Sequence, residues 1–495
     1  TRPRDPDHLD VQWAFANRTI FSGDVDRNDD SQKGWRWNAG EKKWEQYYGR
    51  NSYHVVWFAS EGFNERTTKY EAVTAKPLPV ETTLDGVVVT GGCADYGERG
   101  ESTRMGGGIY LTENGVVSNC IIYQNFALTR GGGVMMNNGG MLVNSMVFRN
   151  ASPGVQVRNG LGGGVYILGN GTVFRTVITN NTARVGGGVY VDEAEYNNPA
   201  YEESLDDMYR GVLVNTLVSN NTSSSDAGAV YFDKLGGLSS STVVKNYCSA
   251  VASDQEGNSG GMIVDGYGIV YNSVLWGNAT LEHTRQFYGK NGKTAESNVP
   301  ASIQVYNTAL QNLSNTIWGV NTVTQKTYAL SDQNSKGRSS IAYDSSFPDF
   351  TNVRVGNVDV INNEAGVYQT TAADVEGTQT LDNALRTIYD VQRWVPSEFS
   401  ALQRKGGSQS EAPYVRYAPV KTQFYVAMTD ILSKAFVEPR VLGAFASDRP
   451  SLQYSVIEDN GVKKLVIFVD PSVDTDLSGE SWESPIISGN SAIEY

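Results

Sequence analysis

Hydrophobic residues in this chain alternate with polar ones in short runs, and glycine, asparagine and serine separate the runs. In the segment Val189 to Asp192, the alternation directs the two valines to one face of a strand and Tyr190 and Asp192 to the other. Such runs are too short for helices and are rich in Val, Ile and Tyr, so they predict β-strands.

Two short motifs recur six times each between about residues 106 and 278. Copies of the first, a glycine-rich triplet before two hydrophobic residues, begin at Gly106, Gly131, Gly162, Gly186, Ala227 and Ser259. Copies of the second end in Asn125, Asn150, Asn181, Asn221, Asn246 and Asn278. The successive spacings are 25, 31, 24, 41 and 32 residues for the first motif and 25, 31, 40, 25 and 32 for the second. Because two unrelated motifs keep nearly the same period, each unit is predicted to be one turn of a solenoid.

This pattern predicts an all-β protein, a right-handed parallel β-helix with irregular surface loops and a mixed C-terminal capping region. Each strand would pair in parallel with its equivalent one coil away, at about 4.8 Å, so equivalent residues would form columns. The right hand follows from the usual sense of parallel crossovers. We expect the glycines at tight bends and close approaches of the backbone, and the repeated asparagines in a ladder of stacked amides.

Three regions are expected. Residues 1–92 would form irregular N-terminal coils, with strands near 18–23, 53–57 and 83–89. Residues 93–320 would form the regular coils; the segments 305–308 and 313–318 echo the repeat at 270–276. Residues 321–495 would hold further coils, a short helix near 381–392 and a β-hairpin of 452–457 with 465–469, which together could cap the open end.

Composition excludes several classes of protein. With 54 acidic and 40 basic residues the net charge is −14, and no basic stripe is visible, so a nucleic-acid partner is not expected. Cys93, Cys120 and Cys248 are too few and too far apart for a disulfide framework or a zinc site, so they are expected to be buried fillers. No apolar run is long enough to predict a transmembrane segment, and the N-terminus has no signal-peptide pattern.

One outward column stands out for its charge. Two residues after each motif tyrosine, the equivalent positions read Thr112, Asn137, Leu168, Asp192, Asp233 and Asp265. Three carboxylates about 4.8 Å apart would repel one another unless they are hydrated or bind a cation. Three interpretations stay open: aspartates that accept backbone hydrogen bonds at strand ends, a calcium site, or a catalytic or sugar-binding pair.

A column of tyrosines runs beside the carboxylates. It comprises Tyr110, Tyr166, Tyr190 and Tyr231, and Met135 interrupts it. Exposed tyrosines next to carboxylates suit binding to sugar rings, although tyrosine is also simply favoured on strand surfaces. An acidic insertion at 192–210, which includes Glu193, would form one wall of a groove there.

A second candidate for calcium lies near the N-terminus. Asp24, Asp26 and Asn28 alternate like the oxygen ligands of a calcium loop, but the glycine and the downstream glutamate of an EF-hand are missing. Calcium is therefore the one cofactor that the sequence suggests, at either acidic site.

An enzyme remains an alternative. Carboxylates on adjacent coils would lie near the separation of about 5 Å that a retaining glycosidase needs. However, the three histidines, His8, His54 and His283, lie far apart, and no motif places a nucleophile beside them. The Gly-His-Gly motif of pectin-cleaving glycosidases is also absent.

The Gly-Gly-Gly-Val-Tyr and Asn-Ser-x-Val-x-x-Asn motifs resemble the repeats of polymorphic outer membrane proteins and related bacterial surface β-helix proteins with a pectate-lyase-like fold. The resemblance covers roughly residues 15–320. It implies a secreted or bacterial cell-surface protein, and a non-catalytic scaffold that binds glycans or partner proteins, like an adhesin or passenger. A polysaccharide lyase or glycoside hydrolase and a structural stalk are the alternatives. The segment Phe468 to Pro471 resembles one that opens such modules, which suggests a longer, multi-module chain.

Overall fold

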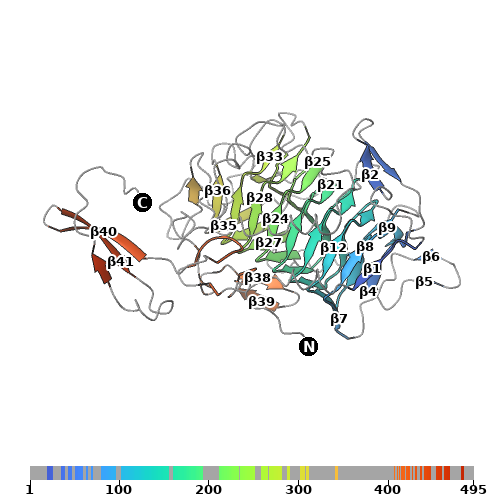
Figure 1. Cartoon of the computed structure of the whole chain (residues 1–495), viewed down its shortest axis with the longest axis horizontal. Coiled ribbons are helices and arrows are strands. Elements are labelled where there is room, and N and C mark those ends of the chain that lie inside the picture. Colours follow the sequence, from blue (N-terminus) through green and yellow to red (C-terminus); the bar gives the residue numbers. More distant parts are fainter. Residues whose placement is uncertain are drawn as a thin grey trace.

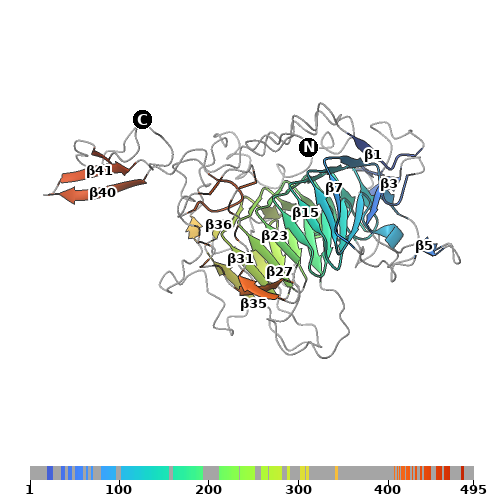
Figure 2. The ribbon, with the colours of Figure 1, turned by 90° about the horizontal axis from the view of Figure 1, so that it is seen from below.

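The computed structural model shows a right-handed parallel β-helix, as the repeats predict (Figures 1 and 2). It describes residues 19–25, 35–38, 43–46, 51–58, 63–64, 69–70, 80–95, 102–154, 160–192, 211–233, 235–250, 258–265, 267–280, 287–289, 302–306, 308–311, 341–343, 453–459, 462–468, 481–483 and single or short positions between 406 and 446.

Four parallel sheets run along the solenoid, and each coil contributes one strand to each sheet. Sheet 1 contains β1 (Ile20–Ser22), β8 (Val88–Thr90), β12 (Ile121–Tyr123), β16 (Met146–Phe148), β20 (Val177–Thr179), β24 (Leu217–Ser219), β28 (Thr242–Val244), β32 (Val274–Trp276), β36 (Ala309–Gln311) and β37 (Ile341–Tyr343). Sheet 2 contains β4 (Val56–Phe58), β10 (Ile109–Thr112), β14 (Val134–Asn137), β18 (Val165–Leu168), β22 (Val189–Asp192), β26 (Val230–Phe232), β30 (Met262–Val264) and β34 (Phe287–Gly289).

The other two sheets complete each coil. Sheet 3 contains β7 (Thr82–Asp85), β11 (Gly115–Ser118), β15 (Met141–Val143), β19 (Thr172–Phe174), β23 (Gly211–Val214), β27 (Leu235–Ser239), β31 (Tyr267–Tyr271) and β35 (Ser302–Tyr306). Sheet 4 contains β9 (Cys93–Ala94), β13 (Phe126–Ala127), β17 (Ala151–Ser152), β21 (Thr182–Val185), β25 (Thr222–Asp226), β29 (Tyr247–Cys248) and β33 (Ala279–Thr280). A 3-10 turn, Ser102–Arg104, precedes β10.

Short antiparallel pairs lie outside this stack. They are β2 (Trp35–Asn38) with β3 (Lys43–Gln46), β5 (Phe63–Asn64) with β6 (Lys69–Tyr70), β38 (Tyr414–Tyr417) with β39 (Val420–Gln423), and β40 (Gln453–Asp459) with β41 (Val462–Phe468) and β42 (Ser481–Glu483).

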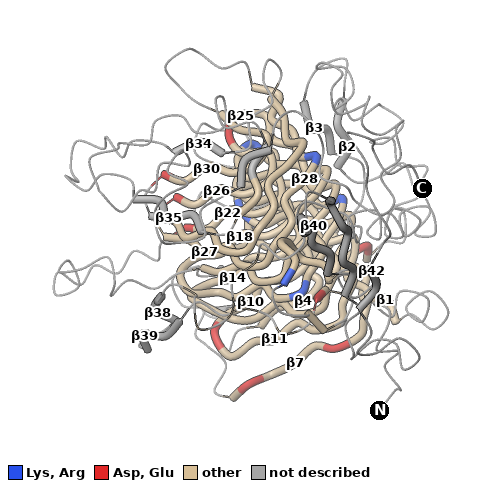
Figure 3. The backbone as a smooth tube through the Cα atoms, turned by 90° about the vertical axis from the view of Figure 1, so that its left-hand side faces the viewer, with Lys and Arg blue, Asp and Glu red and all other residues tan. Residues whose placement is uncertain are grey.

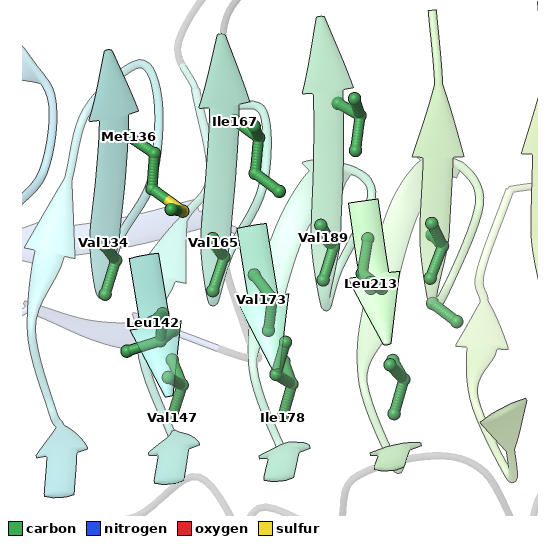
Figure 4. Packing of buried hydrophobic residues seen from close by; sticks show 14 of the residues in the cluster. Val134, Met136, Leu142, Val147, Val165, Ile167, Val173, Ile178, Val189 and Leu213 are labelled. Carbon is green, nitrogen blue, oxygen red and sulfur yellow. The ribbon is translucent and has the colours of Figure 1, made fainter. Parts of the chain in front are cut away.

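Alternation within the strands builds the core. In β22, Val189 and Val191 point into the coil and are fully buried, as expected. Figure 4 shows the inward side chains of successive coils aligned in columns, for example Val134, Val165 and Val189. The interior is thus a continuous stack of aliphatic rows, each stabilised by the coils above and below it.

Glycine serves the bends as predicted. The first glycine of the triplet has a positive φ in four coils, for example 64° at Gly162. The second glycine is a point of close approach, because a Cβ on Gly163 would lie 2.4 Å from the carbonyl oxygen of Thr182 and 2.5 Å from that of Gly187. A side chain at that position would therefore push adjacent coils apart.

The predicted asparagine ladder is present and buried. In each coil the side-chain Nδ2 donates to Oδ1 of the equivalent residue in the next coil at 2.9–3.0 Å, through Asn125, Asn150, Asn181, Asn221, Asn246 and Asn278. The same Oδ1 also accepts the backbone N–H of the preceding asparagine, for example at 2.9 Å from Asn150 to Asn181. These side chains therefore satisfy the backbone at a corner of the coil.

Most strands predicted outside the repeats are confirmed. The segments near 20, 56 and 83–89 form β1, β4, β7 and β8, and residues 302–306 form β35 in register with β31. The hairpin strands also form, because β40 pairs antiparallel with β41 and the pairing ends at Asp459 with Val462, on either side of the predicted Asn-Gly turn. Residues 313–318 and the helix predicted near 381–392 lie outside the described residues.

A C-terminal segment packs on the side of the solenoid. Ala412 and Val426 join an apolar cluster on the outer face of sheet 3, made by Val212, Val214, Leu235, Ile269 and Tyr271. The backbone N–H of Ala444 donates to Oγ1 of Thr242 at 2.9 Å, and Tyr271 donates its hydroxyl to the carbonyl of Ser408 at 3.1 Å. These residues lie over the outer face of sheet 3 at the coils of β23, β27 and β31, and a cap formed by the short helix and the hairpin stays a prediction.

The three cysteines, all within the described part of the chain, are buried and form no disulfide, as expected for small fillers. Among the described residues, no helix has the length and apolar character needed to cross a membrane.

Candidate functional site

The tyrosine column forms on the outer face of sheet 2, in the predicted register. Tyr110 pairs with Met135, Met135 with Tyr166, Tyr166 with Tyr190, and Tyr190 with Tyr231. The expectation that these rings are exposed is wrong: the exposed fractions of Tyr166, Tyr190 and Tyr231 are 0%, 7% and 5%.

The tyrosine rings stack face to face. Tyr166 and Tyr190 stack with centroids 5.4 Å apart and planes 6° apart, and Tyr190 and Tyr231 stack at 4.9 Å and 3°. At the N-terminal end, Trp57 stacks on Tyr110 at 4.3 Å. Because the ring faces contact one another, they are not accessible to a sugar ring. Tyr166, Tyr190 and Tyr231 therefore cannot stack on a sugar in the predicted way.

A second column covers the tyrosines from the side. The residue before each glycine triplet forms a row of bridges through Met105, Arg130, Leu161 and Val185. Met105, Leu161 and Val185 belong to the same apolar cluster as the tyrosines, and the guanidinium carbon of Arg130 lies 5.1 Å from the ring centroid of Tyr166. Each of these residues directly precedes a glycine triplet, so the sequence shows that they form a column. Their spacing alone does not show that the bend at the triplet places this column against the tyrosines.

The carboxylate column also forms as predicted. Leu168 pairs with Asp192, and the backbone N–H groups of Asp233 and Asp265 donate across the coils to Val191 and Phe232. Each of the three aspartates is half-buried. Figure 3 shows acidic positions at the ends of β22, β26 and β30 along one edge of sheet 2. The edge thus carries one carboxylate per coil, about 4.8 Å apart.

The two columns are joined by hydrogen bonds. The hydroxyl of Tyr166 donates to Oδ2 of Asp192 one coil further on, and that of Tyr231 donates to Oδ2 of Asp265 at 2.9 Å. Burial first, and then the negative charge of the neighbouring aspartate, raise the pKa of both tyrosines well above 10. The phenols therefore stay protonated and hold each carboxylate in a fixed orientation.

Earlier coils lack this arrangement because their residues differ. At the column's start, Asn137 donates from Nδ2 to the Tyr110 hydroxyl at 3.0 Å, and Thr112 donates to the carbonyl of Phe58 at 2.6 Å. Burial raises the pKa of Tyr110 to about 12. Among the described coils, the acidic part of the edge therefore comprises those of Asp192, Asp233 and Asp265.

The structure bears only partly on the calcium prediction. Within the described ranges, no three Asp, Glu, His or Cys side chains are grouped closely enough to hold a metal ion. Asp24 forms a bridge with Asn51, and its backbone N–H donates to Oγ of Ser22 at 3.1 Å. Asp26, Asn28 and Glu193 lie outside the described residues, so calcium at the N-terminal site stays a prediction.

His54 lies at the N-terminal end of the aromatic stack. Its Nδ1 donates to the carbonyl of Gly106 at 2.9 Å, and its ring lies 4.8 Å from that of Trp57. Desolvation of the imidazole lowers its pKa to about 4, and the hydrogen bond to Gly106 opposes this only in part. A neutral imidazole inside an aromatic cluster fits a packing role, and sequence reasoning gave His54 no chemical role.

Comparison with protein-family models, curated proteins and solved structures gives no significant match.

Proposed function

We propose that the chain is a non-catalytic scaffold of a secreted or bacterial cell-surface protein, and that it binds a glycan along the edge of sheet 2 that carries Asp192, Asp233 and Asp265. The resemblance of the glycine and asparagine motifs to bacterial surface β-helix repeats supports the location and the adhesin-like role. A chain net charge of −14 adds to the negative field at this edge.

The observation that carries the proposal is the hydrogen bonding between phenols and carboxylates. Tyr166 and Tyr231 are buried, protonated and stacked on Tyr190, so they orient Asp192 and Asp265 on a rigid support. Fixed acceptors lose little conformational entropy on binding, which favours affinity for an extended ligand with matching donors. Since the ring faces are occupied, recognition would depend on hydrogen bonds and charge rather than on stacking.

The test is a glycan array and calorimetry on the parent chain and on the triple variant Asp192→Asn, Asp233→Asn and Asp265→Asn. The amides keep the shape but remove the charges, so we expect at least a tenfold loss of affinity for every glycan that binds. Glu81→Gln with Glu113→Gln is the matched control, because both residues are exposed and lie away from the three aspartates. Equal binding by the parent and the triple variant would refute the site.

The same glycans are then incubated with the protein and examined for cleavage products. Cleavage that the triple variant lacks would replace the scaffold with a lyase or hydrolase at the same edge. A melt with and without chelator tests calcium: a lower melting temperature in chelator, restored by added calcium, would establish a structural ion, and identical melts would argue against one.

A further inference from the structure

Strand β7 ends sheet 3 at the N-terminal end of the solenoid and has one open edge. It pairs with β11 on one side, and no described strand pairs with it on the other. The backbone N–H groups of Thr82 and Gly86 donate to carbonyls on the β11 side. Because these groups alternate in direction along a parallel strand, the N–H groups of Thr83 and Asp85 face the open edge. Such an edge can pair with a strand of another chain.

The inward row of side chains reaches the surface at this edge. Leu84 packs against the core cluster but is only half-buried, whereas Val117 and Leu142, its equivalents in the next two coils, are fully buried. At the same end, Ile20 and Phe21 of β1 are 46% and 39% exposed. An added strand with an apolar residue opposite Leu84 would continue the row and remove apolar surface from water.

The charges beside the open edge are all negative. Glu81 directly precedes β7 and Asp85 ends it, both are exposed, and Figure 3 shows acidic positions near either end of the strand. Their spacing of four residues puts both on the outward face with Thr83. Nδ2 of Asn119 donates to Oδ1 of Asp85 and orients that carboxylate. The described residues 19–25, 51–58 and 80–85 include three acidic residues and no Lys or Arg.

These charges separate two possible occupants of the edge. In a second copy of the same edge, carboxylates would face carboxylates, and like charges on paired strands are destabilising. Opposite charges at the same positions are stabilising, and the backbone groups supply the remaining affinity. We propose that the open edge of β7 binds a β-strand of a partner protein that has two basic residues four positions apart, opposite Glu81 and Asp85, and an apolar residue opposite Leu84. This surface is separate from the glycan-binding edge of sheet 2 and does not depend on it.

The test uses two fluorescently labelled peptides with the sequence of residues 80–86. One keeps that sequence, and the other has the changes Glu81→Lys and Asp85→Lys, so the two differ only in the charge of the outward positions. Fluorescence anisotropy at low salt should show that the parent chain binds the basic peptide at least about tenfold more tightly. Added salt should reduce this preference, because both carboxylates are exposed.

Three variants of the chain locate the interaction. Glu81→Lys with Asp85→Lys should reverse the order of the two affinities, which a merely unfolded variant cannot do. Thr83→Pro removes an N–H that faces the open edge but none that bonds to β11, so it should weaken binding of the basic peptide about tenfold. Ser224→Lys, at an exposed position of β25, is the control for added positive charge and should change neither affinity by more than about twofold.

Circular dichroism of each variant verifies the fold. Equal affinities of the parent for the two peptides, or an unchanged order in the variant with both lysines, would overturn the inference. Full affinity of Thr83→Pro would mean that charge alone attracts the peptide, and strand addition would be wrong. If sedimentation shows that the parent associates with itself and Thr83→Pro prevents it, a second copy replaces the basic partner.

Discussion

Removal of one rung of the asparagine ladder tests how the coils are held together. The side chain of Asn181 makes four hydrogen bonds: Nδ2 donates to Val147 and Asn221, and Oδ1 accepts the backbone N–H and the side-chain Nδ2 of Asn150. Asn181→Ala removes all four. The backbone N–H of Asn181 still donates to Oδ1 of Asn221, so that oxygen keeps one of its two hydrogen bonds.

The main cost comes from the group that is left behind. The backbone N–H of Asn150 loses its acceptor inside the coil, where water cannot replace it, at about 1–3 kcal/mol. The lost hydrogen bonds add about 0.5–1.5 kcal/mol each, not fully additively, so we expect the free energy of unfolding to fall by about 3–5 kcal/mol.

The measurement is equilibrium denaturation in guanidinium, followed by far-ultraviolet circular dichroism. Thr172→Ala is the control, because Thr172 is half-buried in the adjacent sheet 3 strand β19 and should change the free energy of unfolding by only about 0.5 kcal/mol. If the free energy of unfolding of Asn181→Ala lies within about 1 kcal/mol of that of the parent, the asparagine ladder is not a main source of stability.

Three further predictions follow from contacts elsewhere in the coils. Gly163→Ala should lower the free energy of unfolding by at least about 2 kcal/mol in the same assay, because its Cβ would meet the carbonyl of Thr182 at 2.4 Å; an unchanged midpoint would refute the close approach. The pKa of His54 falls from 6.5 to about 4 on folding, so between these pH values the imidazole is protonated in the unfolded chain but neutral in the folded one. Protonation therefore stabilises the unfolded chain, and the melting temperature should fall as the pH drops from about 6.5 to 4. His54→Asn should flatten that slope, and an equal slope would exclude His54 as its source. Burial raises the pKa of Cys120 to about 11, so its thiol should react with a disulfide reagent at pH 8 only after denaturation; rapid reaction of the native chain would contradict its burial.

The sequence predicts the fold well because the repeat makes local information redundant. Six copies of each motif set the register, and residues such as Asn150 and Asp233 could be assigned to columns before any coordinate was known. The register of a parallel stack is determined by the period, so a correct period places every strand.

Contacts between different parts of a coil were harder to predict. The alternation correctly placed Tyr190 on the outer face, but it does not show that Val185 and its equivalents fold over that face and bury the ring. The same holds for sheet 3, where Val212 and Ile269 are outward in the pattern yet covered by Ala412 and Val426, which lie far later in the chain. Burial of an outward position depends on which distant segment packs there, and periodicity contains no information on that.

The direction of the asparagine ladder has a consequence for the length of the protein. In the ladder, each side-chain amide donates to the next coil toward the C-terminus and accepts from the previous coil. Every junction between neighbouring rungs therefore has the same donor and the same acceptor. A coil such as residues 162–185 could therefore be duplicated in place without leaving an unmatched amide at either junction. Whole-coil duplication would lengthen the rod by about 4.8 Å per copy while the chemistry at the Asp192 edge stayed intact. The length of such a rod can therefore change without any change in the residues of the Asp192 edge.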